Sequence, residues 1–302
     1  MKKIIVVGSS NTDMVIKSEK LASPGETVLG GEFYMAAGGK GANQAVAAAR
    51  LGGNVYFAAK VGDDLFGKQA IENYKNDNIN TDFVFIDKQN SSGIALIMVD
   101  KNAENCISVA GGANNNLLPE DLEEVINIIN KDDIVLMQME VPIKTIEFVA
   151  QEASKRGALI VLNPAPAAKI SKSIIEKLFL ITPNKNEAEL LTGISIKNDD
   201  DIKSALLKLR EMGAEKPVMT LGSKGSAYLS NDILEFVASR KVEAVDTVGA
   251  GDVFNGALCV AISENMDFKK AINFASCAAS ISVTRKGAQS SIPQRKEVDM
   301  II

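Results

Sequence analysis

The segment from residue 246 to residue 252, Asp-Thr-Val-Gly-Ala-Gly-Asp, places a glycine-rich turn between two carboxylates, and an apolar helical pattern follows it directly. Glycines let backbone N–H groups approach a ligand closely, and a helix start adds unpaired donors and a partial positive charge. Such a turn can hold an anion, typically phosphate. Asp252 is itself negative and suits a different task, accepting a proton from a group that attacks the phosphate. The segment therefore suggests phosphoryl transfer to a hydroxyl, with an ordinary capped turn as the alternative.

A second glycine-rich helix start lies at residues 38–45, Gly-Gly-Lys-Gly-Ala-Asn-Gln-Ala. Its glycine spacing, and the lack of Ser or Thr after Lys40, exclude a Walker phosphate-binding loop. Lys40 and Asn43 can donate the hydrogen bonds that the hydroxyl groups of a sugar require. The small residues that follow also fit a simpler interpretation, a turn that enters a buried helix.

Polar side chains also follow two of the expected strands. Asn11 and Asp13 come after the first strand, and Glu140 comes after a later one. Ligands of open α/β sheets bind beyond the carboxyl ends of the strands. An amide beside a carboxylate supplies the mixed donors and acceptors that bind a diol, although each of these residues alone also fits an ordinary turn or loop.

Two further segments suit a nucleotide. Asn184 can cap the helix that follows Pro183, with Glu187 at its third position in a capping-box arrangement. The functional interpretation places both residues near Mg²⁺, through the waters that this ion keeps. Residues 220–225, Thr-Leu-Gly-Ser-Lys-Gly, offer glycines and hydroxyls for phosphates or ribose, and a simple β-turn explains them equally well.

Composition narrows the class of protein. The chain has 302 residues, of which 46% are hydrophobic, so it can bury a large core. A formal net charge of −5 argues against a nucleic-acid partner bound through its phosphates. No apolar run reaches the roughly 20 residues of a membrane span. The three cysteines are widely spaced in apolar surroundings, which predicts a reducing, cytoplasmic location.

The residues that are missing exclude other chemistry. The chain has no histidine, which removes histidine triads and histidine metal sites and leaves acid–base work to Asp, Glu, Lys, Tyr or Cys. A dinucleotide-dependent oxidoreductase is also excluded, because residues 8–11, Gly-Ser-Ser-Asn, lack the Gly-x-Gly-x-x-Gly spacing after the first strand.

Strand-length apolar runs alternate with amphipathic helical patterns, which predicts a doubly wound, mostly parallel sheet with helices on both faces. The expected strands are 3–7, 55–59, 134–138, 159–162, 178–181 and 217–221, and the expected helices are 42–51, 65–77, 119–129, 143–155, 185–191, 200–212, 250–264 and 268–284. Segments at about 12–35 and 92–110 lack helical periodicity and predict a small β-sheet lid. No linker divides the chain, so residues 1–302 are expected to form a single α/β domain.

Together these features resemble the ribokinase family of carbohydrate kinases, over nearly the whole chain from Gly8 to Pro293. Both glycine-rich segments stand in the family's order and spacing. Residues 163–167 (Asn-Pro-Ala-Pro-Ala), 182–187 (Thr-Pro-Asn-x-x-Glu) and 283–289 (Val-Thr-Arg-Lys-Gly-Ala-Gln) extend the match. The resemblance implies ATP-dependent phosphorylation of D-ribose at its 5-hydroxyl, with Mg²⁺, a monovalent cation activator such as K⁺, and a homodimer formed through the lid.

The resemblance also assigns roles by matching position. Asp252 would be the catalytic base, and the ribose hydroxyls would be held by Asn11, Asp13, Gly39, Lys40, Asn43 and Glu140. The anion hole would consist of the N–H groups of Gly249, Ala250 and Gly251. ATP would contact Asn184, Thr220, Gly222, Ser223, Gly225, Gly251 and Ser276, with Glu187 organising Mg²⁺ and phosphate. The K⁺ ligands would be Asp246, Val248, Ser282, Arg285, Gly287 and Ser291, several of them through backbone carbonyls.

Some alternatives stay open at this point. Ser276 stands where some relatives place Asn or His near the adenine, which bears on nucleotide preference. The sugar could instead be fructose, a keto-deoxy acid or a nucleoside, since hydroxyl-binding residues discriminate among sugars only through their geometry. A non-catalytic sugar-binding regulator is the alternative from a different class, and an intact Asp252 with an intact glycine turn weighs against it.

Overall fold

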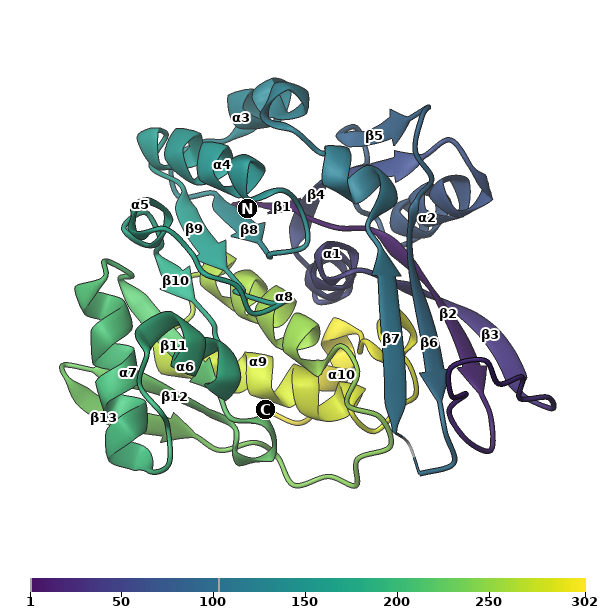
Figure 1. Ribbon diagram of the computed structural model, residues 1–302. Helices are drawn as coiled ribbons and strands as arrows, with labels where there is room; N and C mark the ends of the chain where they lie inside the picture. Colours follow the sequence, from purple (N-terminus) through teal and green to yellow (C-terminus); the bar gives the residue numbers. More distant parts are fainter. Residues whose placement is uncertain (1, 103) are drawn as a thin grey trace.

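The computed structural model describes residues 2–102 and 104–302. A nine-stranded sheet forms its centre, in the order β13-β12-β11-β10-β9-β8-β1-β4-β5 (Figure 1). In chain order these strands are β1 (Lys3–Val7), β4 (Asn54–Gly62), β5 (Val84–Asp87), β8 (Ile134–Met137), β9 (Leu159–Leu162), β10 (Leu180–Ile181), β11 (Lys216–Thr220), β12 (Ser226–Ser230) and β13 (Ile233–Val237). All neighbours from β5 to β11 pair in parallel, and only β12 and β13 are antiparallel.

Helices cover both faces of this sheet, as the alternation of strands and helices predicted. Ile4 and Val6 of β1 join a core cluster that includes α1 (Lys40–Arg50), α8 (Ala250–Ser263) and α9 (Phe268–Ser282). The intervening Ile5 and Val7 join the cluster on the other face, with α3 (Glu123–Ile128), α4 (Ile143–Lys155), α5 (Lys172–Ile175) and α7 (Asp199–Glu211). Because successive side chains of a strand point to opposite faces, an uninterrupted apolar strand requires this double cover. The remaining helices are α2 (Leu65–Asn76), α6 (Lys185–Thr192) and α10 (Arg295–Asp299).

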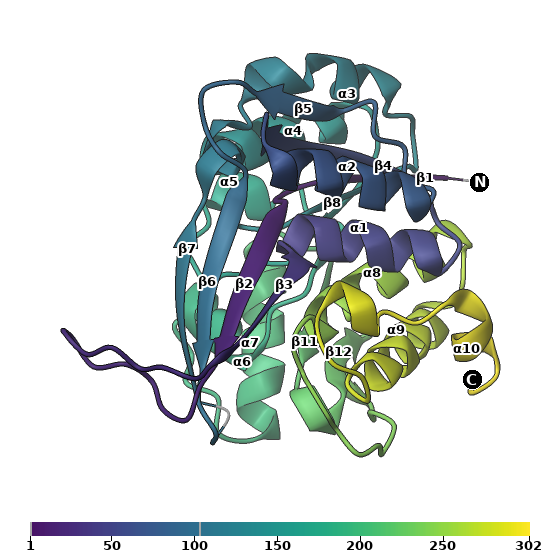
Figure 2. The same cartoon turned by 90° about the vertical axis from the view of Figure 1, so that its right-hand side faces the viewer.

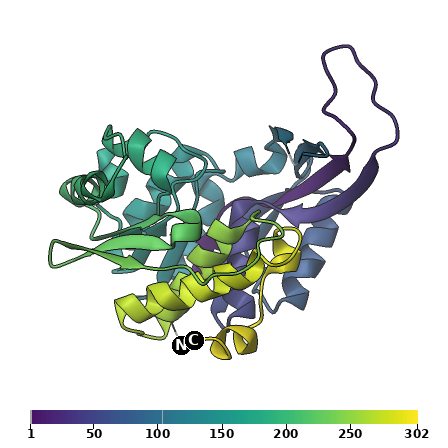
Figure 3. The ribbon, with the colours of Figure 1, turned by 90° about the horizontal axis from the view of Figure 1, so that it is seen from below.

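A separate four-stranded sheet lies against one side of this body, in the order β3-β2-β6-β7 (Figure 2). Its strands are β2 (Asn11–Lys17), β3 (Glu32–Gly38), β6 (Gly93–Val99) and β7 (Asn105–Ala110), within or close to the two segments that the sequence assigned to extra strands. Two antiparallel pairs, β2–β3 and β6–β7, are joined through the parallel pair β2–β6. The connection between β2 and β3 extends away from the rest of the molecule (Figure 3).

The observed elements differ from the expected ones in several places, and helices α5 and α10 were not expected. The strand expected at 178–181 is confined to Leu180–Ile181. The helix expected at 119–129 divides into a 3₁₀ turn, Pro119–Leu122, and α3, because the backbone at Leu122 leaves helical geometry (φ −104°, ψ 3°). Strands β5 and β13 were not expected, although the positive φ values at Asn231 and Asp232 form the kind of tight turn that joins β12 to β13.

The carboxyl ends of the parallel strands lie at one edge of the large sheet, and several of the candidate site residues lie near this edge. Asn11 begins β2 a few residues after β1 ends, and Lys40 and Ala250 are the first residues of α1 and α8. No helix in the described part of the chain is long and apolar enough to cross a membrane.

Candidate active site

The start of α8 carries backbone donors that are left open. Its cap residue Gly249 has a positive φ of 75°, and no side chain caps the helix. Within the described residues, the N–H groups of Gly249, Gly251 and Asp252 have no acceptor, and that of Ala250 makes only a long bond of 3.3 Å to the Thr247 carbonyl. Gly251 is exposed, and a Cβ at this position would meet no atom within 4 Å. This positive helix end is therefore free to accept an anion.

Asp252 lies in the first turn of the same helix but is buried, with 6% of its surface exposed. Its Oδ2 accepts from Asn43 Nδ2 at 2.9 Å, and its Oδ1 accepts from Gln44 Nε2 at 3.0 Å. Burial raises the pKa of this carboxyl, while the Lys40 charge and the two amide donors act to lower it. A carboxylate with a raised pKa is a stronger base than an exposed aspartate, and the two amides hold it in one orientation.

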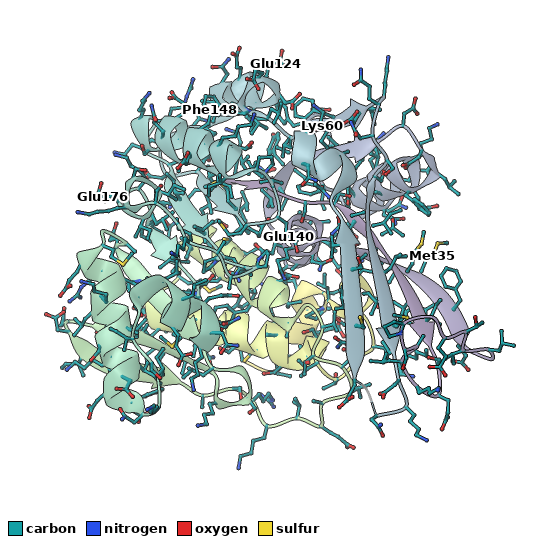
Figure 4. The ribbon with its side chains drawn as sticks, viewed as in Figure 1. Met35, Lys60, Glu124, Glu140, Phe148 and Glu176 are labelled. Carbon is teal, nitrogen blue, oxygen red and sulfur yellow. The ribbon has the colours of Figure 1, made fainter. Side chains whose placement is uncertain are left out.

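At the start of α1, by contrast, the first backbone N–H groups have acceptors within the protein. Glu140 Oε2 accepts from the Lys40 N–H at 2.9 Å and from Ser9 Oγ at 2.5 Å. The N–H groups of Gly41 and Ala42 donate to Ser9 Oγ (3.3 Å) and to the Ser9 carbonyl (2.8 Å). In the view of Figure 4, Glu140 is drawn beside α1, between the large sheet and the second sheet, and it is half-buried. It therefore caps a helix in addition to any contact with a sugar.

Four of the expected sugar-binding side chains come from β2 and the first turn of α1: Asn11, Asp13, Lys40 and Asn43. Asn11 Oδ1 accepts from the buried Asn114 at 2.7 Å, which fixes its amide with the NH₂ group as the remaining donor. Asn43 Oδ1 is buried and has no hydrogen-bond partner among the described residues. An orphaned buried acceptor beside Asp252 fits a hydroxyl of a bound sugar, since unpaired buried polar atoms are unfavourable.

The charges around the expected sugar-binding side chains are unbalanced. Burial, reinforced by Glu140 and Asp252, raises the pKa of Asp13 to about 6, and the Lys40 charge opposes the shift. Burial raises the pKa values of Asp252 and Glu187 as well, and the Lys40 charge opposes both shifts, while Lys40 forms no ion pair with any described residue. Gly38 leaves room for Asp13, because a Cβ there would lie 2.5 Å from both carboxylate oxygens and would force that side chain to move. One ammonium group thus influences several carboxylates, an arrangement that favours donors and cations as ligands.

The expected nucleotide residues are only partly brought together. Asn184, Thr220 and Gly222 line a cavity of ≈ 500 Å³ with Lys185, Lys197 and Lys224. Glu187, Ser223, Gly225 and Ser276 do not line it, and Ser276 is buried on α9. Gly225 has a structural reason for its identity, since its φ is 94° and a Cβ would lie 2.0 Å from the Val237 carbonyl oxygen. The lysines around Asn184, Thr220 and Gly222 make this cavity suitable for an anionic ligand.

Glu187 forms the capping box that the sequence offered as the alternative. Its carboxylate accepts from Asn184 N and Asn184 Nδ2, both at 2.8 Å, and its own N–H donates to Asn184 Oδ1 at 2.9 Å. No group of three or more His, Cys, Asp or Glu residues in the described ranges could hold a metal ion. This is compatible with Mg²⁺, which takes one or two carboxylates together with waters and substrate phosphates.

The expected K⁺ ligands lie on the loop that precedes α8, at the end of α9, and on the segment that follows α9 up to the 3₁₀ turn Gln289–Ser291. Asp246 accepts from the Val248 N–H at 3.0 Å and from the Gly287 N–H at 2.9 Å. The N–H of Asp246 donates to the Val283 carbonyl at 3.1 Å, and Ser282 and Ser291 are buried. The Ser282 carbonyl already accepts from the Arg285 N–H at 3.0 Å. Carboxylate and carbonyl oxygens are the donors that hard cations prefer, so the chemistry of this set fits the ion.

Sequence reasoning missed four residues of this region: Ser9, Gln44, Asn114 and Asn163. Ser9 and Asn114 fix Glu140 and Asn11, and Gln44 bonds both Asp252 and Asn163. Gln44 follows Asn43 directly, and Asn163 follows β9, so position alone could have suggested both. Asn114 stands among three consecutive asparagines beyond the expected lid segment, and nothing in their sequence distinguishes it from Asn115 and Asn116.

Comparisons with known proteins identify the family of this chain. The pfkB family carbohydrate kinase model matches residues 1–295. The ribokinase of Haemophilus influenzae is 41% identical over 98% of this chain and 97% of its own length. The deoxyribokinase of Salmonella typhimurium is 37% identical over 96% of this chain and 95% of its own length. The structure of the Arabidopsis thaliana ribokinase complexed with ribose and ATP superposes with a TM-score of 0.91 at 32% identity, covering 99% of this chain and 98% of that one.

The chain therefore belongs to the pfkB family of carbohydrate kinases, as its motifs indicated. Its fold is that of the solved ribokinases, a large mostly parallel sheet between helices with a small separate sheet. The resemblance to ribokinases extends over the full length of the chain rather than over the glycine-rich segments alone.

Proposed function

We propose that this protein transfers the γ-phosphoryl group of ATP to the 5-hydroxyl of D-ribose, giving ribose 5-phosphate and ADP. One observation carries the proposal: a buried carboxylate, Asp252, lies one residue beyond open backbone donors at the start of α8. Asn11, Asp13, Lys40 and Asn43 supply polar groups for the sugar. The curated ribokinases, and the related structure named as a complex with ribose and ATP, support this choice of substrates.

In the proposed reaction the ribose oxygen forms a bond to the γ-phosphorus, and the bond from that phosphorus to the bridging oxygen of ADP breaks. ADP leaves with the electron pair, and Asp252 accepts the proton of the hydroxyl. Phosphoryl transfer has a loose transition state, so it demands positioning and charge stabilisation more than a strong base. The N–H groups of Gly249, Ala250 and Gly251 would stabilise the charge on the transferred group.

The cofactor assignments are part of the same proposal. Mg²⁺ would neutralise phosphate charge when bound, with Glu187 beside it. Asn184, Thr220, Gly222, Ser223, Gly225, Gly251 and Ser276 would contact the nucleotide, and Glu140 and Gly39 would complete the sugar side. K⁺ held by Asp246, Val248, Ser282, Arg285, Gly287 and Ser291 would keep the neighbouring turn of α8 in shape.

A second sugar has a specific observation in its favour. Because a deoxyribokinase is 37% identical over nearly the whole chain, 2-deoxyribose is a real competitor for ribose. An ADP-release assay with ribose, 2-deoxyribose, fructose, a keto-deoxy acid and a nucleoside tests the proposal. We expect the highest kcat/KM with ribose. A preference for another sugar would overturn the substrate assignment, and absence of ADP release with every sugar would overturn the proposed activity.

We also propose that residues 1–302 form one domain that dimerises through the second sheet and works in the cytoplasm. Ile16, Phe33, Met35 and Leu96 lie on the face of this sheet opposite Asp13, and each exposes about half its surface. Such an apolar patch suits a second copy of the chain. Light scattering should report a dimer that Met35→Glu dissociates and that Leu29→Glu, on the β2–β3 connection, leaves intact. A monomeric parent protein would refute this assembly.

A further inference from the structure

A row of buried polar side chains lies behind the start of α8. Gln138, Asn163 and Thr182 directly follow β8, β9 and β10, which are neighbours in the large sheet. Gln44 of α1 and Asn255 of α8 complete the row, and all five side chains are buried. None of them was assigned a role by the motifs, and their polar atoms are hydrogen-bonded to one another or to Asp252 and Gly251, except Gln138 Oε1, which has no partner among the described residues.

The first branch of the row ends on Asp252. Gln44 Nε2 donates to Asp252 Oδ1 and to Asn163 Oδ1, both at 3.0 Å. Gln44 Oε1 in turn accepts from Gln138 Nε2 at 2.7 Å. The amide of Gln44 is therefore bonded at both ends, and its side chain is completely buried. The Gln44 side chain is therefore unable to contact a ligand bound beside Asp252, but it determines where one oxygen of Asp252 lies.

The second branch ends on the glycine turn. Asn163 Nδ2 donates to the Thr182 carbonyl at 3.4 Å, and Thr182 Oγ1 donates to Asn255 Oδ1 at 2.6 Å. Asn255 Nδ2 then donates to the Gly251 carbonyl at 2.8 Å. The same row of hydrogen bonds thus ties the carboxylate of Asp252 and the peptide unit of Gly251 to the rigid ends of three adjacent strands.

We propose that Gln44 is a positioning residue, which holds the carboxylate of Asp252 charged and in register with the open amides of the α8 turn. This inference rests on the proposed role of Asp252 as the base. An amide donor inside the protein stabilises the ionised carboxylate and restrains its rotation. The other charged groups that face Asp252 are Lys40 of α1, Glu140 after β8 and Asp13 of β2, and all three remain in the variants below.

Gln44→Met removes the donor while keeping a side chain of similar length. We expect kcat to fall about 10- to 100-fold, as for the loss of groups that orient metal ligands. The KM values for ribose and ATP should change little, because Gln44 does not reach either ligand. The acid limb of the kcat–pH profile should move to higher pH by about one unit, because the ionised form of Asp252 has lost a donor.

Two further variants separate positioning from simple destabilisation. Thr145→Val removes a buried hydroxyl of α4 that donates to the Leu117 carbonyl, on the face of the sheet opposite α1 and α8, and should lower Tm without moving the pH profile. Gln138 contacts Gln44 but not Asp252. Gln138→Met should therefore lower kcat and move the acid limb to higher pH, but by less than Gln44→Met. The double variant Gln44→Met/Gln138→Met should be no worse than Gln44→Met alone, since the two groups act in series. A kcat loss with an unmoved acid limb would overturn the proposal.

A measurement without turnover keeps this test separate from the proposed function. The ¹³C carboxyl signal of Asp252, assigned by its loss in Asp252→Asn, can be titrated in the sugar-free protein. We expect a higher pKa in Gln44→Met, and in Gln138→Met should the first variant fail to fold. An unchanged titration refutes positioning even if ribose is phosphorylated. A shifted titration in a protein that phosphorylates no sugar refutes the proposed function alone.

Discussion

Helices α1 and α8 begin in the same way but are completed differently. Each follows a glycine with positive φ, 89° at Gly39 and 75° at Gly249, and neither has a side-chain cap from that residue. At α1 the carboxylate of Glu140 and the backbone and hydroxyl of Ser9 take the first N–H groups. At α8 the N–H groups of Gly251 and Asp252 have no acceptor among the described residues, and that of Ala250 makes only the long bond to the Thr247 carbonyl. A glycine-rich helix start is therefore a ligand site only where the rest of the fold leaves it open.

The glycines themselves differ in the same sense. A Cβ on Gly41 would lie 2.5 Å from Ser9 N and 2.6 Å from the Gly8 carbonyl carbon, so this glycine allows β1 and α1 to pack closely. A Cβ on Gly251 would meet nothing within 4 Å, so packing gives no reason for its identity. In the proposed function, this open space allows a ligand to come close to the backbone.

The largest loss of activity is expected from replacing Asp252, the proposed catalytic base in the first turn of α8. Asp252→Asn should lower kcat about 10²–10⁴-fold, because it removes proton acceptance in the transition state. Ribose affinity measured by calorimetry should be largely kept. Asp267→Asn is the matched control, since Asp267 caps α9 through the N–H groups of Lys269 and Lys270 and lies outside the site. Substantial kinase activity in the Asp252 variant would refute the base assignment.

The same substitution at the two helix starts should then have opposite consequences. Gly251→Ala should keep the fold, or raise the free energy of unfolding by up to about 1 kcal/mol, while its methyl group blocks the anion and lowers kcat about 10²–10³-fold. Gly41→Ala should lower the free energy of unfolding by about 1–3 kcal/mol through overpacking. Urea unfolding and ADP release measure both quantities. Equal behaviour of the two variants would remove the distinction between the helix starts.

Replacing Asp13, which lies near Glu140 and Asp252, should raise thermal stability and weaken ribose binding. With its pKa raised to about 6, Asp13 binds protons more readily in the folded than in the unfolded protein, so its contribution to stability falls as pH rises from about 4 through 6. Asp13→Asn should therefore raise Tm at pH 8 more than at pH 5, while weakening ribose binding at pH 8. Thermal unfolding and calorimetry at both pH values check this. A lower Tm at pH 8 in the variant would contradict it.

The smallest effect is expected from the loops behind α8. Exchanging K⁺ for Na⁺ should lower kcat, because a poorly fitting ion would leave the neighbouring turn less well held. Asp246→Asn should lower kcat in both salts and make the two rates similar. Asp232→Asn, on an exposed turn, should retain the preference of the parent protein. Equal rates of the parent protein in the two salts would count against the cation site.

Much of the fold followed from the sequence because its signals are local. The apolar runs and helical periods predicted the parallel sheet, and residues 249–252 predicted a helix start with a carboxylate in its first turn. What closed α1 could not be predicted in this way. Ser9 and Glu140 lie 131 residues apart, and no spacing rule links them.

The same reason explains the missed polar residues. Gln44 and Asp252 are separated by 208 positions, and Asn114 and Asn11 by 103, so these contacts depend on how distant elements pack. Glu187 illustrates the opposite case. Its capping box with Asn184 is local and was foreseen as one of two interpretations, and the structure contains it whether or not Mg²⁺ also lies nearby.

The central claim, that α8 is left open for the transferred phosphoryl group while α1 is closed, can be tested with backbone amide NMR. Protein saturated with ribose, Mg²⁺ and ADP is titrated with fluoroaluminate, which imitates the transferred group. We predict large chemical-shift changes at the N–H groups of Gly249, Ala250 and Gly251 and little change at Lys40, Gly41 and Ala42. Changes confined to the α1 residues, or absent from both helix starts, would contradict the account.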